Sequence, residues 1–320
     1  MENKVYKDLT IVVPLYNEED LLDELYQRLS ITVSNLNLDA EVVLVNDGSK
    51  DNSLEKIKWI CNTNSKFRFL SLSRNWGHQA SILAGIDHSY GKAIVIIDGD
   101  LQDPPELIPA LYEEYKKGFQ VVYAKRKLRE GESWFKLWTA KLFYRILRTI
   151  TSIEIPLDTG DFRIISRRVA MHLVGLQERN QFIRGQIAWL GFKTSFIEYD
   201  REKRFKGTTK FSLRKMIKLA LDGITGFSNF PLRLATFLGF FFTVIAFLLI
   251  LYALYSKYIL NRVATGWTSL MVSSMLIGGI QLLCVGIIGE YLGRVGLDVK
   301  QRPNYIVEEN SEDVGDQNSI

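Results

Sequence analysis

The sequence reads AIVIIDGDLQDPP from residue 93 to residue 105. Its first five residues are apolar and rich in β-branched side chains, which predicts a buried strand over Ala93–Ile97. Asp98, Asp100 and Asp103 follow at once, so acidic side chains are expected at the carboxyl end of this strand. The stretch therefore predicts a strand that ends in an acidic turn.

Strand signals recur along the first half of the chain and alternate with helical patterns. Further strands are predicted over Leu9–Val13, Glu41–Val45, Phe67–Leu72 and Val121–Ala124. Apolar residues recur at helical spacing from Leu21 to Val33, and another helix is expected from about His78 to His88. Strands that alternate with helices indicate an α/β fold with a mostly parallel sheet, covered by helices on both faces.

Polar residues follow three of the predicted strands. Asn17 and Glu18 come after the first strand, Asp47 and Gly48 after the second, and the acidic residues 98–103 after the fourth. In an open parallel sheet, ligands bind outside the carboxyl ends of the strands. The sequence therefore predicts a ligand site at this edge of the sheet.

The segment Asp98-Gly99-Asp100 is the candidate metal site. Carboxylates two residues apart present hard oxygen ligands toward one point, which suits Mg²⁺ or Mn²⁺ bound to a diphosphate. Gly99 leaves room for the backbone to approach a ligand. A plain acidic turn, with Asp103 as a helix cap before Pro104, explains only part of the pattern.

The composition argues against several classes of protein. The formal net charge of the 320 residues is +4, whereas a dedicated nucleic-acid binder would be strongly basic. The three histidines lack the spacing of zinc ligands, and His78 is interpreted as a helix-start or packing residue. Cys61 and Cys284 lie in a predicted helix and an apolar segment, so no disulfide is expected. The N-terminal residues do not resemble a signal peptide, so the soluble part is expected in the cytosol.

Two apolar segments in the last third of the chain have the length of membrane spans. Leu232–Tyr255 and Ser269–Tyr291 each supply about 20 mostly apolar residues, enough to cross a hydrocarbon core. Two buried core helices are the alternative interpretation. A short loop between the spans places both flanks on one side of the membrane. Basic residues before the first span and after the second, at Arg294, Lys300 and Arg302, favour the cytosol for that side.

The segments beside the spans also have distinct compositions. Eight basic side chains from Arg201 to Lys218 precede the first span, where such a run attracts phosphate groups. Apolar residues from Leu213 to Phe227 form one stripe of a basic amphipathic helix, expected in the headgroup layer or packed on the soluble domain. After Pro303 the chain is polar and acidic, which predicts a partly disordered tail. The predicted boundaries are 1–205 for the soluble domain, 206–230 for the amphipathic region, 231–292 for the two spans and 293–320 for the tail.

Five motifs carry a family resemblance. Three stand at strand ends: Val13-Pro14-Leu15-Tyr16-Asn17-Glu18-Glu19, Val45-Asn46-Asp47-Gly48-Ser49 and Asp98-Gly99-Asp100-Leu101-Gln102-Asp103-Pro104. Two come later: Asp158-Thr159-Gly160-Asp161-Phe162-Arg163 and Arg204-Phe205-Lys206-Gly207-Thr208-Thr209-Lys210. The first three resemble glycosyltransferase family 2, the inverting enzymes with a GT-A fold. The last two, followed by two spans, resemble its dolichyl-phosphate mannose synthase branch and the bacterial polyprenyl-phosphate glucosyltransferases of the GtrB kind.

The resemblance implies roles for particular residues of a catalytic GT-A domain. Those implied to hold the base and ribose of a nucleotide are Pro14, Tyr16, Glu18 and Asp47. Those implied to bind the metal that bridges the diphosphate are Asp98, Asp100 and Gln102, with Gly99 between the first two. Those implied to grip the acceptor phosphate and the diphosphate are Arg126, Arg201, Arg204 and Lys210. The stretch Arg129–Lys136 would be a loop that closes on the donor.

The chemistry of the implied reaction fits these residues. A sugar–diphosphate bond breaks readily once its leaving group is neutralised, which a divalent metal and basic residues achieve. The acceptor phosphate is already an anion, so strong help from a general base is not required. Asp158 and Asp161 are both candidates for orientation or base assistance. Inversion would follow from one in-line displacement.

The sequence departs from the family pattern at two places. The mannose synthase branch has Gly-Glu-Ser-Lys where this chain has Gly207-Thr208-Thr209-Lys210, so the contacts of that glutamate are absent. Gln181-Phe182-Ile183-Arg184-Gly185 resembles the Gln-x-x-Arg-Trp motif of processive synthases, but Gly185 replaces the tryptophan. This difference favours the transfer of one sugar per turnover.

The expected function is inverting transfer of a sugar to a polyisoprenyl phosphate such as undecaprenyl phosphate, and the family resemblance favours UDP-glucose as the donor. The reaction is expected at the cytosolic face of the inner membrane. A processive or glycolipid-forming family 2 enzyme, or a non-catalytic membrane scaffold that binds nucleotide, are the alternatives. The sequence leaves open the sugar, the choice between Mg²⁺ and Mn²⁺, the polyprenol length and the oligomeric state. Small residues of the second span predict close packing in a homo-oligomer, at Gly278, Gly279, Gly286 and Gly289.

Overall fold

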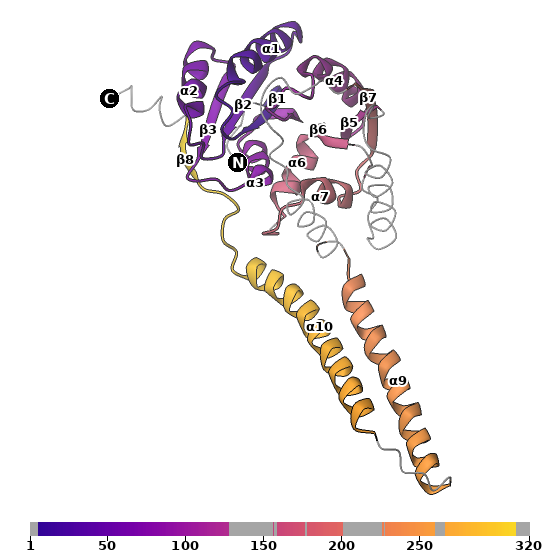
Figure 1. Ribbon diagram of the computed structural model, residues 1–320. Coiled ribbons are helices and arrows are strands. Elements are labelled where there is room, and N and C mark those ends of the chain that lie inside the picture. Colours follow the sequence, from indigo (N-terminus) through magenta and orange to yellow (C-terminus); the bar gives the residue numbers. More distant parts are fainter. Residues whose placement is uncertain are drawn as a thin grey trace.

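The computed structural model describes residues 6–127, 156, 159–176, 178–200, 226, 228–259 and 266–311. They form an α/β domain from which two long helices project (Figure 1). The strands are β1 (Lys7–Leu15), β2 (Ala40–Asn46), β3 (Phe67–Leu72), β4 (Gly91–Ile96), β5 (Val121–Arg126), β6 (Thr159–Ser166), β7 (Thr194–Tyr199) and β8 (Val307–Asn310). The helices are α1 (Leu22–Asn35), α2 (Ser53–Thr63), α3 (His78–Asp87), the 3₁₀ turn η1 (Pro105–Leu107), α4 (Ile108–Lys116), α6 (Arg167–Val174), α7 (Ile183–Trp189), α9 (Phe230–Tyr258) and α10 (Trp267–Val299).

The eight strands form one sheet in the order β7-β5-β6-β4-β1-β2-β3-β8. Strands β4, β1, β2 and β3 pair in parallel, and so do β5 and β7. The antiparallel pairs are β4 with β6, β5 with β6, and β3 with β8. The prediction of an α/β fold with a mostly parallel sheet is confirmed.

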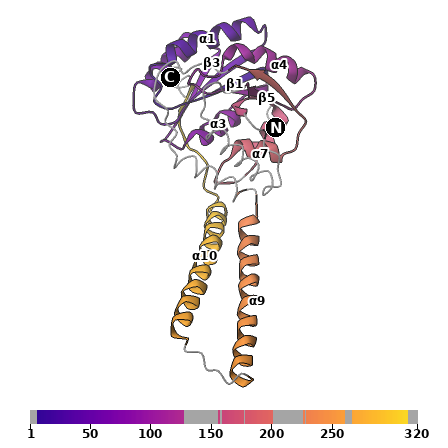
Figure 2. The same cartoon turned by 45° about the vertical axis from the view of Figure 1, so that its right-hand side comes forward.

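Strand β1 shows why the central strands read as continuous apolar runs. Leu9, Ile11 and Val13 pack in one core, beneath α1 and α2, while Val12 packs in a second core with α3 on the other face. A strand buried on both faces gains from an apolar side chain at nearly every position. Figure 2 shows α1 and α3 on opposite sides of the strands.

The loops after β1 and β2 are joined by hydrogen bonds at the carboxyl end of the sheet. The Asn17 N–H donates to Ser49 Oγ at 3.0 Å, and the Lys50 N–H donates to Asn17 Oδ1 at 2.8 Å. The Glu18 N–H donates to Ser53 Oγ at 3.0 Å. These bonds hold the loop that follows Pro14 against the loop that follows Asp47, as expected for two neighbouring parallel strands.

Helices α9 and α10 contain two segments long and apolar enough to cross a membrane, Phe230–Ser256 and Ser269–Val299. Only 6% and 0% of their most apolar windows are buried within the protein, so the alternative of two buried core helices is wrong. Apolar surface on this scale is unfavourable in water and suits a lipid environment. The two helices project side by side from one end of the α/β domain (Figures 1 and 2). Helix α10 continues past the predicted end of the span at Tyr291 to Val299.

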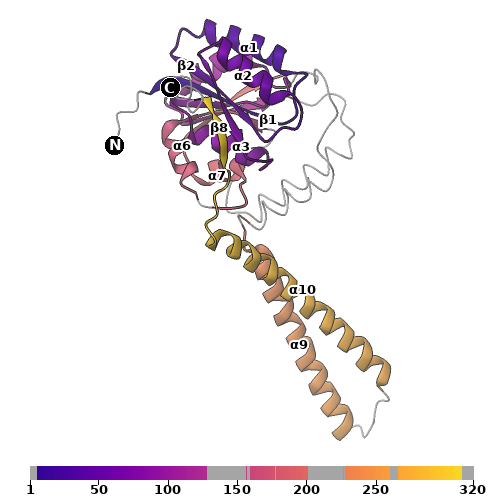
Figure 3. The ribbon, with the colours of Figure 1, turned by 90° about the vertical axis from the view of Figure 1, so that its left-hand side faces the viewer.

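The chain after α10 returns to the α/β domain, which corrects the prediction of a disordered tail for part of its length. Strand β8 pairs antiparallel with β3, with Leu70 opposite Asn310 and Ser71 opposite Glu309 (Figure 3). The Phe69 N–H donates to Ser311 Oγ at 2.6 Å. We call residues 300–311 the C-terminal strap, because they join the end of α10 to the edge of the sheet.

The end of α10 and the C-terminal strap make further contacts with the α/β domain. The Arg179 backbone N–H donates to Asp298 Oδ1 at 2.8 Å, and its guanidinium donates to the Pro303 carbonyl. The Tyr305 hydroxyl donates to Asp87 Oδ2 at 2.5 Å. The Ser73 N–H donates to the Ile306 carbonyl at 3.0 Å. The strap therefore contacts the loop between β3 and α3 as well as β3 itself.

We expect Tyr305→Ala to lower the free energy of unfolding by about 2 kcal/mol, because it removes a partly buried ring and its hydrogen bond to Asp87. Urea unfolding of the detergent-solubilised chain measures the change. Tyr305→Phe keeps the ring and should lose about half as much. Equal stability of Tyr305→Ala and the unsubstituted chain would show that the strap is not held through this side chain.

Candidate functional site

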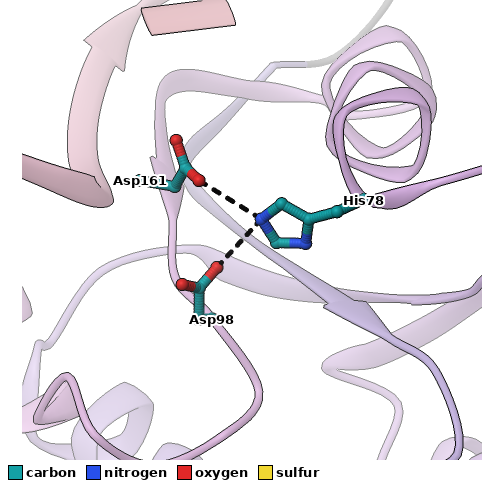
Figure 4. A group of neighbouring side chains, drawn as sticks. All are labelled: His78, Asp98 and Asp161. Carbon is teal, nitrogen blue, oxygen red and sulfur yellow. Dashed lines mark hydrogen bonds and ion pairs between the residues drawn. The ribbon is translucent and has the colours of Figure 1, made fainter. Parts of the chain in front are cut away.

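Three side chains from separate elements meet at the carboxyl end of the sheet. His78 begins α3, Asp98 follows β4 and Asp161 lies in β6. The His78 Nε2 atom lies 3.3 Å from Asp98 Oδ1 and 3.3 Å from Asp161 Oδ2. Figure 4 shows the two carboxylates pointing at the same ring nitrogen. Their ligand atoms all lie within 4.8 Å of one another, so the group has the dimensions of a metal site.

The acidic turn after β4 has a strained backbone. Leu101 adopts a positive φ of 55° although it is bulky, and only 2% of it is exposed. Its side chain packs in the core beside α4, which stabilises the left-handed conformation. The Asp100 Oδ1 atom accepts the Gln102 N–H at 3.2 Å, so the turn also fixes this second carboxylate. Burial of Leu101 thus orients the polar residues on both sides of it.

The Asp161 carboxylate is buried and paired with cations. Arg184 of α7 forms a two-pronged ion pair with it, Nε to Oδ1 at 2.8 Å and Nη2 to Oδ2 at 2.9 Å. The fully buried Arg163 adds Nη2 to Oδ1 at 3.2 Å. Burial acts to raise the pKa of Asp161, but Arg184, His78 and Arg163 outweigh it and hold this pKa well below its usual range. Asp161 is therefore ionised at neutral pH.

His78 owes its position to the turn before α3. Gly77 has a φ of 100°, a conformation that glycine adopts without strain. Burial acts to lower the pKa of the His78 imidazole, but the carboxylates of Asp98 and Asp161 outweigh this effect and raise it. The side chain is 45% exposed, so water screens part of the attraction.

Asp47 stabilises the same turn through hydrogen bonds to its backbone. Its Oδ1 atom accepts the Trp76 N–H at 2.7 Å, and its Oδ2 atom accepts the Gly77 N–H at 3.0 Å. Burial raises the pKa of this carboxyl, and the two backbone donors oppose the change. The family resemblance implies a role for Asp47 in nucleotide binding. The structure gives Asp47 a second role, because its hydrogen bonds hold the turn that carries His78.

Arg126 lies at the end of β5, beside Asp103 of the acidic turn. Its Nη2 atom lies 3.6 Å from Asp103 Oδ1, and its Nε–H donates to the Tyr199 hydroxyl at 3.2 Å. The Tyr199 hydroxyl in turn donates to Asp103. A Cβ added at Gly160 would lie 2.7 Å from Arg126 Nη2, so this glycine makes room for the guanidinium. The structure thus packs Arg126 against the acidic turn.

The donor atoms at this edge fit a hard divalent cation. The Asp98 Oδ1 atom is buried and accepts no hydrogen bond of standard geometry within the described part of the chain, where His78 Nε2 is its ion-pair partner at 3.3 Å. A carboxylate oxygen with one such partner keeps a lone pair that can bind a cation. Asp98, Asp100 and Gln102 all offer oxygen ligands, which Mg²⁺ and Mn²⁺ prefer. Gly99 has a packing reason as well, since an added Cβ would meet Leu15 Cδ2 at 2.4 Å.

The remaining site residues divide into two groups. Pro14 is buried at the end of β1, and Tyr16 and Glu18 lie half-buried in the loop after it. Asp158, Arg201, Arg204 and Lys210 lie outside the described residues, as do the stretch 129–136 and most of the amphipathic region.

Sequence reasoning missed two members of the site. The sequence predicts His78 only as a helix-start or packing residue; it does begin α3, but it also contacts both aspartates. Arg184 stands out in the sequence only as part of a motif typical of processive synthases. Its ion pair with Asp161 joins residues 23 positions apart, a contact with no local signal.

Comparison with known proteins places this arrangement in a family. Residues 10–174 match the model of glycosyl transferase family 2. A glycosyltransferase of Bacillus subtilis is 47% identical, with 94% of this chain and 93% of the relative covered. A glycosyltransferase of Synechocystis sp. is 43% identical, with 94% of each chain covered. The bactoprenol glucosyl transferase of Shigella phage SfII is 38% identical, with 94% of this chain and 98% of the relative covered.

The match and the motifs agree in position. The matched residues include the ends of β1, β2 and β4, where the three strand-end motifs lie, and β6 with Asp161. The relatives align across nearly the whole chain, so the similarity extends through α9 and α10. The chain therefore belongs to glycosyltransferase family 2.

Proposed function

We propose that the protein transfers glucose from UDP-glucose to a polyprenyl phosphate at the cytosolic face of the inner membrane, in a reaction that requires Mg²⁺ or Mn²⁺. The nucleotide-sugar donor would bind to the soluble domain, residues 1–205, and α9 and α10 would span the bilayer. The acceptor is proposed because a relative that aligns over nearly the whole chain is named a bactoprenol glucosyl transferase.

One observation carries the proposal for the chemistry. Asp98 places a buried carboxylate oxygen, 3.3 Å from His78 Nε2, after the end of β4 and beside Asp100 and Gln102. Asp98, Asp100 and Gln102 would hold the cation, which when bound neutralises charge on the diphosphate leaving group. Asp47 keeps the turn before α3 in place, and Arg126 brings a positive charge to the same edge.

The arrangement of the helices supports a lipid acceptor. Helix α7, whose Arg184 contacts Asp161, lies at the end of the α/β domain from which α9 and α10 project (Figure 1). A phosphate carried at the membrane surface would approach the domain from this end. The anionic acceptor needs no proton removed before attack, so we assign no general base among the described residues.

Incubation with radiolabelled UDP-glucose and undecaprenyl phosphate tests the proposal. We expect label in the organic phase, with its sugar released by mild acid, and no transfer when a chelator removes divalent cations. Adding back Mg²⁺ or Mn²⁺ should restore the rate. Parallel reactions with other UDP-sugars and with GDP-mannose would identify the preferred donor.

Two controls make the result decisive. A chain in which a flexible linker replaces residues 230–299, so that the C-terminal strap is kept, would show whether the spans are needed for a lipid acceptor but not for nucleotide binding. Label in a water-soluble polymer would favour a processive enzyme. Nucleotide binding with no transfer to any acceptor, in the presence of both metals, would favour a scaffold and contradict the proposal.

A further inference from the structure

A chain of contacts connects α7 to the candidate metal ligand. Arg184 pairs with Asp161 at 2.8 and 2.9 Å, Asp161 lies 3.3 Å from His78, and His78 lies 3.3 Å from Asp98. Its members come from α7, β6, α3 and the turn after β4. This series of contacts therefore crosses four elements and ends at Asp98 Oδ1, the atom that we assign to the cation.

The contacts of Asp161 argue against a role as general base. Its Oδ1 atom faces Arg184 Nε and Arg163 Nη2, and its Oδ2 atom faces Arg184 Nη2 and His78 Nε2. Its side chain is only 5% exposed. A carboxylate bonded on both oxygens has no lone pair turned toward a reactant, but it is well placed to orient its neighbours.

We propose that Arg184 and Asp161 are positioning residues, which fix the His78 ring against Asp98 and so hold the Asp98 carboxylate in the orientation that binds the cation. The proposal rests on the proposed function, because it concerns the metal site of that reaction. It adds Arg184 and His78 to the functional residues, and it gives Asp161 the task of orientation.

The geometry of Arg184 explains why a guanidinium is needed. A planar fork meets both carboxylate oxygens at once and fixes the plane of the carboxylate. A lysine ammonium would keep the charge but meet the carboxylate as a single point. Asp161 would keep Arg163 as a partner in that case, so its charge would stay paired while its orientation loosened. Arg184→Lys therefore tests orientation rather than charge.

Mn²⁺ binding measured without turnover is the test. The full-length, detergent-solubilised chain is titrated with Mn²⁺ in the presence of UDP, and the loss of the free Mn²⁺ signal is followed by electron paramagnetic resonance. We expect Arg184→Lys to weaken Mn²⁺ binding about tenfold, as is typical when a partner behind a metal ligand is altered. The Mn²⁺ concentration for half-maximal transfer should rise by the same factor, with kcat at saturating Mn²⁺ within about twofold of the unsubstituted chain.

Two further variants complete the design. His78→Gln breaks the link to Asp98 at a side chain that is 45% exposed, so folding is retained, and the same tenfold weakening is expected. Arg168→Lys, on the exposed face of α6, makes the same chemical change away from the site and should bind Mn²⁺ normally.

The outcomes separate this proposal from the proposed function. Normal Mn²⁺ affinity in both Arg184→Lys and His78→Gln would overturn the positioning role, and so would a fall in kcat at saturating Mn²⁺ with unchanged affinity. Failure of the unsubstituted chain to bind Mn²⁺ with UDP would instead overturn the metal-dependent reaction itself.

Discussion

Asp98→Asn is expected to lower the rate of sugar transfer by about a thousandfold or more, with no loss of fold. The substitution keeps the size of the side chain and removes the charge that would hold the cation. Without the cation, the negative charge on the leaving group is no longer neutralised. The Asp98 side chain is 23% exposed, and its Oδ1 atom lies 3.3 Å from His78 Nε2, a contact that the asparagine amide oxygen can still accept. Initial rates of lipid labelling, measured beside thermal unfolding of the same preparation, separate the two effects.

Asp39→Asn is the matched control for this prediction. Asp39 is an exposed aspartate paired with Lys7 at 2.9 Å, before β2 and far from the acidic turn. Its substitution should leave the rate within twofold, because an exposed ion pair contributes little. If Asp98→Asn transferred sugar as fast as Asp39→Asn, and a chelator slowed neither, the metal site would have to be sought elsewhere.

The central strands were predictable from sequence because their signals are local. Phe67–Leu72 forms β3 with the predicted bounds, and the runs near Leu9, Glu41 and Ala93 form β1, β2 and β4. Most residues of each strand are buried, so apolar side chains dominate its sequence. Strand β8 could not be predicted in this way. Its residues are mostly polar, and it exists because the backbone at the edge of β3 offers it partners across more than two hundred positions.

The candidate site was predictable in part. Asp98 and Asp100 stand two residues apart after a clear strand, so local pattern was enough to identify them. His78, Asp161 and Arg184 meet only because β4 and β6 are neighbours in the sheet and α3 and α7 cover the same face. No spacing in the sequence encodes that meeting. The sheet order that brings these residues together includes the antiparallel pair of β4 and β6, which strand–helix alternation does not predict.

Asp47 illustrates a different limit. A polar residue at a strand end predicts a ligand contact, but the same residue also satisfies buried backbone N–H groups nearby. Its bonds to Trp76 and Gly77 were invisible until the turn before α3 was placed. A carboxylate at the functional edge of a sheet can therefore stabilise the backbone of the site in addition to any contact with the ligand.

Glu41→Ala is expected to lower the free energy of unfolding by about 3 kcal/mol while leaving the activity of the folded protein unchanged. Glu41 is 1% exposed and accepts hydrogen bonds from the Thr10 hydroxyl at 2.6 Å and the Tyr90 N–H at 2.8 Å. It also pairs with Arg68 at 3.0 Å. Removing one member of a buried ion pair leaves the other charge and its polar neighbours without compensation, which is costly.

This buried acid is a useful contrast to Asp98. Glu41 lies at the amino end of β2, about 20 Å along the strand direction from the carboxyl end where the site is formed. Urea unfolding should show the loss of stability, and rates per active molecule, counted by nucleotide binding, should match those of the unsubstituted chain. Glu41→Gln, which retains an acceptor for the Thr10 hydroxyl, should recover part of the stability. A lower transfer rate in folded Glu41→Ala would mean that the amino end of the sheet takes part in the reaction. The assignment of the site to the carboxyl end alone would then be wrong.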